Sequence, residues 1–81
     1  MTTDRDLDRW LMYAEDHARQ LVANRTETNI RQMRRRFHAM TAQSDVMGRL
    51  WRNLLTRYTA AELDAAYNAR CAAIVGREVQ R

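Results

Sequence analysis

The sequence has 81 residues, of which 46% are hydrophobic and 30% charged, and its formal net charge is +4. These values are typical of one small globular domain spanning residues 1–81, and they argue against a disordered chain. With no proline, two glycines and one cysteine, the chain has few turn residues for a multi-stranded sheet and no disulfide framework.

The first predicted helix covers about residues 3–24, where apolar side chains recur at helical spacing. They are Leu7, Trp10, Leu11, Ala14, Ala18, Leu21 and Val22. The polar segment 24–29 then interrupts the pattern. Two interpretations stay open for residues 1–42: two helices joined by a turn, or one continuous bent helix.

Three further helices are predicted, over about residues 28–41, 45–58 and 60–76. Ser44 is the expected N-cap of the third, and Thr59 and Glu62 form a capping box for the fourth. Gly76 is a candidate C-terminal stop. In the second helix Ile30, Met33, Phe37 and Met40 share an arc of about 80°.

These elements predict an all-α fold, a compact bundle of about four helices. The expected core is Trp10, Leu11, Leu21, Met33, Phe37, Leu50, Trp51, Leu54, Leu63, Tyr67 and Ile74. A chain this short has more apolar helix surface than one core is expected to cover, so a homodimer is predicted. No run approaches transmembrane length and the N-terminus lacks a signal-peptide core, so we expect a cytoplasmic protein without a membrane role.

All fourteen basic residues are arginine, and they are concentrated in the middle of the chain. Residues 25–57 carry a net charge of +6, against −2 for residues 1–24 and 0 for residues 58–81. The guanidinium group binds phosphates and carboxylates in a bidentate manner. A GC-rich coding genome is the alternative explanation for the absence of lysine.

On a helical wheel Arg31, Arg34, Arg35 and His38 share an arc of about 100°, apart from the apolar residues. Such a face is either a solvated helix surface or a patch that contacts phosphate. Six candidate contacts to DNA phosphate follow: Arg31, Arg34, Arg35, Arg36, Arg49 and Arg52. Because no aromatic residue lies among the arginines and no base-reading motif is present, any DNA contact is expected to be sequence-independent duplex binding.

The sequence predicts no catalytic site, no cofactor and no metal site. His17, His38 and Cys71 do not have metal-ligand spacing, and a cysteine nucleophile needs an orienting base and a cleft. Arg70 is unusual because it lies on the apolar arc of the last helix. Its side chain either packs along its stem and reaches solvent, or forms an ion pair across a partner interface.

From about residue 26 to residue 76 the chain resembles the Hha/YmoA family of small bacterial regulators. The resemblance is carried by "TETNIRQMRRRF", "MGRLWRNLLTRYTAAEL" and "AYNARCAAIVG". It implies a helical protein that docks on a nucleoid-structuring protein of the H-NS type and presents basic residues to DNA. The third segment places Tyr67, Arg70 and Cys71 at the implied partner interface, although apolar residues replace an acidic cluster of the family there.

Two functions are therefore expected as alternatives. One is a small non-enzymatic modulator of transcription or nucleoid structure, which docks on a protein partner and offers an arginine face to DNA phosphates. The other is a helical protein–protein interaction module or inhibitor, of a plasmid- or phage-borne type, with no nucleic-acid role.

Overall fold

Four helices form the fold of residues 4–25 and 29–79, the parts of the chain that this computed structural model describes. They are α1 (Arg5–Ala23), α2 (Ile30–Ala42), α3 (Asp45–Leu54) and α4 (Ala60–Val79). These described residues contain no strand, so the prediction of an all-α bundle is confirmed. The expected helix starts at residues 3 and 28 lie outside the described residues.

Polar side chains begin the helices, as local sequence chemistry requires. The Asp4 carboxylate accepts hydrogen bonds from the backbone amides of Asp6 and Leu7, and Asn29 caps α2 in the same way. The predicted N-cap Ser44 accepts the Met47 amide at 3.2 Å. The predicted capping box is also confirmed (Thr59, Glu62), since each side chain accepts a hydrogen bond from the other residue's backbone amide, at 3.0 and 3.1 Å.

The structure decides where the helices end. Residues 4–42 form two helices rather than one bent helix: α1 ends at Ala23, and Arg25 takes a left-handed conformation with φ 56°. The third helix ends at Leu54, not near residue 58, because the following residues turn and direct Arg57 and Tyr58 toward Asp4. The predicted stop at Gly76 is wrong. This glycine has no positive φ, and α4 continues through it to Val79.

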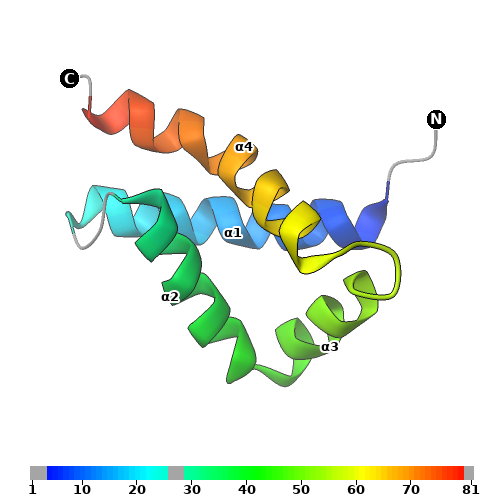
Figure 1. The fold of residues 1–81 in the computed structure, drawn as a ribbon. Helices are drawn as coiled ribbons and strands as arrows, with labels where there is room; N and C mark the ends of the chain where they lie inside the picture. Colours follow the sequence, from blue (N-terminus) through cyan, green and yellow to red (C-terminus); the bar gives the residue numbers. More distant parts are fainter. Residues whose placement is uncertain (1–3, 26–28, 80–81) are drawn as a thin grey trace.

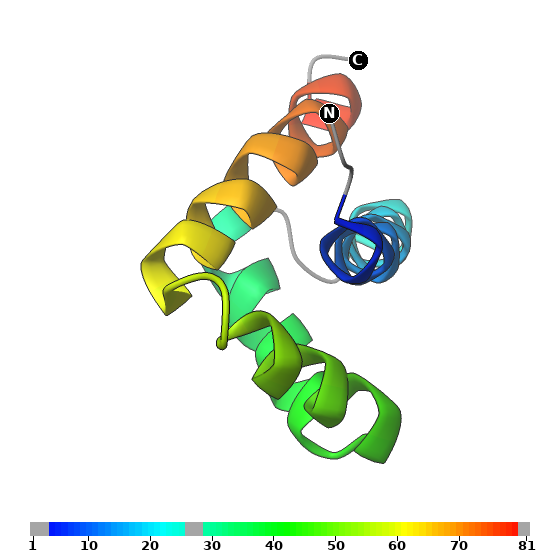
Figure 2. The same cartoon turned by 90° about the vertical axis from the view of Figure 1, so that its right-hand side faces the viewer.

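Helix α1 contacts each of the other three helices, and its contact with α4 is the most extensive in the bundle. In Figure 1, α4 crosses α1 while α2 and α3 form a V on the other side of it. The thinnest dimension of the molecule is 18 Å, about two helix diameters. Every helix therefore keeps one face toward solvent, including α1, which the other helices cover from one side only (Figure 2).

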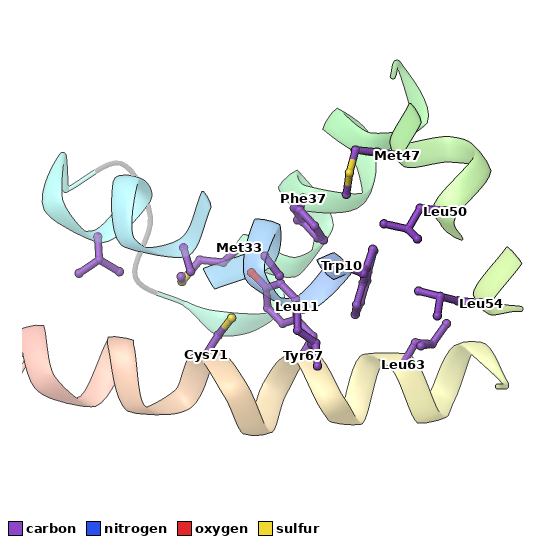
Figure 3. Close-up of a cluster of buried hydrophobic side chains, with 13 residues drawn as sticks. Trp10, Leu11, Met33, Phe37, Met47, Leu50, Leu54, Leu63, Tyr67 and Cys71 are labelled. Atoms are coloured by element: carbon purple, nitrogen blue, oxygen red, sulfur yellow. The ribbon is translucent and has the colours of Figure 1, made fainter. Parts of the chain in front are cut away.

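Trp10 of α1 lies at the centre of the core (Figure 3). Its ring centroid is 5.5 Å from that of Phe37, 5.5 Å from that of Trp51 and 6.4 Å from that of Tyr67, so one side chain joins all four helices. The predicted core is largely confirmed. Three of its members are only partly buried: Leu21, Trp51 and Ile74.

Candidate nucleic-acid interface

The arginine-rich face of α2 is not a single solvated face, because α4 packs against one of its edges. Arg34 donates a hydrogen bond from Nη1 to Oδ1 of Asn68 at 2.6 Å, and its Nε lies 3.6 Å from the Asp64 carboxylate. Its side chain is only 19% exposed. His38 also lies 3.1 Å from Asp64 through Nε2. Arg34 and His38 therefore attach α2 to α4, which corrects the expectation that they face solvent.

Arg36 is exposed on α2, and its charge acts on His17 of α1. Burial lowers the pKa of His17 in α1, and the positive charge of Arg36 lowers it further, so this guanidinium lies toward α1. Arg36 also makes a contact of its own within the chain. Of the six predicted phosphate contacts, Arg34 and Arg36 are thus engaged inside the fold.

The other four predicted contacts are exposed: Arg31 and Arg35 on α2, and Arg49 and Arg52 on α3. None of the four forms an ion pair with a residue that the structure describes, and we call them the unpaired arginines. They do not make one compact patch, since α2 and α3 diverge in the V of Figure 1. Arg49 lines a hollow of about 350 Å³ together with Arg9 of α1, while Arg31 and Arg35 lie one helical turn apart on α2.

The predicted partner interface is mostly inside the bundle. Tyr67 and Cys71 are both 0% exposed in the core, so the chain's own helices already cover them. Arg70 is partly exposed, and it pairs within the chain, with Nη1 2.7 Å from the Glu15 carboxylate and Nη2 3.9 Å from that of Asp8. Neither sequence interpretation of Arg70 describes this contact, because only the packing of α4 on α1 brings the acids within reach.

Burial in the core shifts the pKa values of two side chains, Cys71 and Tyr67. Burial raises the pKa of Cys71 to about 11, which keeps the thiol protonated and weakly nucleophilic at neutral pH. Burial also raises the pKa of the Tyr67 phenol. The Tyr67 hydroxyl and the Trp10 indole nitrogen are buried, and neither has a hydrogen-bond partner among residues 4–25 and 29–79.

No group of three or more histidine, cysteine, aspartate or glutamate side chains within residues 4–25 and 29–79 is arranged to hold a metal ion. In the same part of the chain, no helix is both long enough and apolar enough to cross a bilayer.

Uncovered apolar surface was predicted from the length of the chain, but its position was not. Met40 belongs to the apolar arc predicted for the second helix, but its side chain is 44% exposed, because it lies at the edge of that arc. It lines a hollow of about 260 Å³ with Tyr13 of α1 and Met47 of α3. Met12, Tyr13 and Val46 are also large and exposed. A helical wheel of residues 3–24 could have indicated Met12 and Tyr13, since both fall outside its apolar arc.

Comparison of the chain with protein-family models, curated protein sequences and solved structures finds no match.

Proposed function

We propose that this protein is a small, non-enzymatic, cytoplasmic modulator of transcription or nucleoid structure that docks on a protein partner and offers arginines to DNA phosphates. The observation that carries the proposal is the set of unpaired arginines, Arg31, Arg35, Arg49 and Arg52. Exposed guanidinium groups in a segment of net charge +6, with no acid of the described chain to neutralise them, favour anionic ligands.

The packing narrows the proposed contact set from six arginines to four. Arg34 is held by Asn68 and Asp64, so its transfer to a phosphate would break contacts between α2 and α4. The phosphate backbone is a long anionic surface that charges on two diverging helices can contact at separate points. Such contacts supply affinity without reading the base sequence.

A protein partner is needed because a few phosphate contacts give only weak binding to DNA. Three or four phosphate contacts alone give non-specific dissociation constants of roughly 10⁻⁴ to 10⁻⁶ M at physiological salt. Useful occupancy then requires a partner already on DNA, or a second copy of the chain, because linked sites raise the effective concentration. The Hha/YmoA resemblance suggests a nucleoid-structuring protein in this role.

The experiment is fluorescence anisotropy of two unrelated DNA duplexes across a salt series. Changing Arg31 and Arg35 to glutamine should lower the magnitude of the log–log salt slope by about 1.8, because each lost phosphate contact contributes about 0.9. The matched control changes Arg19 and Arg70 to glutamine. It removes the same charge from arginines that already pair with acids of α1.

A clear change in the first variant and little in the second supports phosphate contact by the unpaired arginines. Equal changes in both would attribute binding to net charge alone and contradict the proposed contact set. If wild type binds neither duplex at low salt, the DNA-binding proposal is overturned.

The second candidate function is a helical interaction module or inhibitor without a nucleic-acid role. The exposed apolar side chains Met12, Tyr13, Met40 and Val46 favour it, since large exposed apolar patches often mark protein–protein contacts. In this alternative the unpaired arginines form a solvated surface. The two functions differ in the anisotropy experiment, where the interaction module gives no salt-dependent binding.

A further inference from the structure

The fold leaves the outer face of α1 uncovered, and this face carries large exposed side chains such as Met12 and Tyr13. In Figure 2, which views α1 nearly end-on, the other helices lie to the left of α1, above it and below it, and its right-hand side is left uncovered. The exposed side carries a hollow of about 390 Å³, open to solvent. Its lining residues all belong to α1: Arg5, Asp8, Arg9, Met12, Tyr13 and Asp16.

The side chains of this face follow a definite order along the helix. Arg5, Asp8 and Arg9 lie toward the N-terminal end and together carry a net charge of +1, and the Asp8 carboxylate lies 3.9 Å from Arg70 of α4. Met12 and Tyr13 lie in the middle, and Asp16 lies toward the C-terminal end. Arg5 and Arg9 have no ion pair with any residue in the described part of the chain. The face is thus basic at one end, apolar at its centre and acidic at the other end.

This order is self-complementary for an antiparallel partner with the same sequence. Arg9 and Asp16 are equally far from the midpoint between Met12 and Tyr13, roughly 5 Å along the axis at 1.5 Å per residue. A two-fold axis at that midpoint brings Arg9 opposite Asp16 of the partner subunit, and the same contact occurs a second time by symmetry. A parallel arrangement would instead bring arginine onto arginine.

We propose that the outer face of α1 docks antiparallel on the same face of a second copy of this chain. Met12 and Tyr13 form the apolar centre of the contact, and reciprocal Arg9–Asp16 pairs flank it. Within the described residues Asp16 pairs with Arg19 alone, at 3.1 Å between two well-exposed side chains. Such exposed pairs contribute little to stability, so Asp16 can exchange Arg19 for Arg9 of the partner subunit at small cost.

The area of the contact indicates which neighbouring residues join it. A stable interface takes about 800 Å² from each partner, about one seventh of the 5874 Å² that the chain exposes. One helix face is too narrow to supply this area alone. Exposed apolar side chains next to α1 extend it, since Met40 shares a hollow with Tyr13 and Val46 shares one with Arg9.

The inference does not use DNA binding, so either proposal can fail while the other stands. A dimer would nevertheless carry twice as many unpaired arginines as a monomer. Its affinity for DNA phosphates would then be higher, because linked binding sites raise the effective concentration.

Charge exchange tests the arrangement by sedimentation equilibrium, with circular dichroism to verify folding. Wild type should dimerise at micromolar concentration. The single variants Arg9→Asp and Asp16→Arg should each raise the dissociation constant roughly tenfold or more, because both symmetry-related pairs change from attraction to repulsion. The double variant carrying both changes should dimerise again.

An equimolar mixture of the two single variants tests the proposed Arg9–Asp16 pairing most directly. One chain then carries two acids and the other two arginines at these positions, so a heterodimer should form although neither variant dimerises well by itself. A 9.6 kDa wild-type species at high concentration would overturn the proposal. A wild-type dimer unaffected by either single variant would overturn it too, since the contact would then lie elsewhere.

Discussion

The arginines tied to the acids of α1 and those exposed on α2 and α3 differ in what they can do. Arg19, Arg57 and Arg70 all pair with carboxylates between residues 4 and 16. Arg57 reaches Asp4 and Asp6 from the turn after α3, and Arg70 reaches Glu15 from α4, so these arginines connect distant segments. The unpaired arginines connect nothing within the described residues. Arginine thus has a structural role where it pairs with the acids near α1, and it remains available for ligands where it is exposed on α2 and α3.

The largest expected effect concerns the core that both regions share. Replacing Phe37 by alanine should lower the free energy of unfolding by about 3–5 kcal/mol, the usual cost for a fully buried phenylalanine. Trp51 is only partly buried, so Trp51→Ala should cost less despite the larger side chain. Urea denaturation measures both. If Trp51→Ala lowers the free energy of unfolding as much as Phe37→Ala or more, the assignment of Phe37 to the centre of the core is wrong. Two separate unfolding transitions would show that the four helices do not share one core.

Neighbouring arginines of α2 allow a sharper test of the paired and unpaired classes. Arg34→Ala removes a part-buried contact to Asn68 and Asp64 and should destabilise the protein by about 1–2 kcal/mol. Arg35→Ala removes an exposed side chain of the same charge and should change stability by less than about 0.5 kcal/mol. Thermal denaturation of both variants decides it. Similar losses would mean that exposure and pairing do not separate these arginines.

The smallest expected effect is the pH response of the contact between Arg57 and Asp4. A hydrogen bond from Arg57, with others from Tyr58 and the Leu7 amide, lowers the pKa of Asp4 to about 2 from a model-compound value of 3.8. Because the folded-state pKa is lowered, the stabilisation is present above about pH 4 and is lost as the pH falls toward 2.

Asp4→Asn is the matched variant, since asparagine keeps the N-cap of α1 and removes the charge. The unfolding temperature of wild type should therefore fall more steeply than that of the variant between pH 4 and pH 2. If the unfolding temperatures of wild type and variant fall equally with pH, the ion pair of Asp4 with Arg57 does not stabilise the fold. Arg57 would then contribute no more to stability than the unpaired arginines do.

Local chemistry made much of the fold predictable. The capping box at Thr59 and Glu62 and the N-cap at Ser44 depend on groups three residues apart, and both formed as expected. Apolar spacing likewise predicted that Trp10, Phe37 and Tyr67 are buried. Gly76 was misjudged because a glycine weakens a helix without being required to end it.

The candidate sites were harder to predict because they depend on what lies across from each helix. Arg34 and Arg35 are adjacent in sequence, and both were assigned to the same solvated arc. Only the position of α4 gives Arg34 the partners Asp64 and Asn68 and leaves Arg35 exposed. Tyr67 and Cys71 were assigned to a partner interface, although the packing of the other helices buries both.

The sequence by itself therefore determined four helices, their caps and most of the apolar side chains that meet in the core, since these follow from spacing and from hydrogen bonds within a few residues. The tertiary structure alone decided which charges are neutralised by residues far apart in the chain, whereas Arg19 pairs with Glu15 at i,i+4 spacing within α1. An ion pair such as Arg70 with Glu15 joins residues far apart in the chain, and a guanidinium remains available only where no neighbouring helix brings a carboxylate within reach.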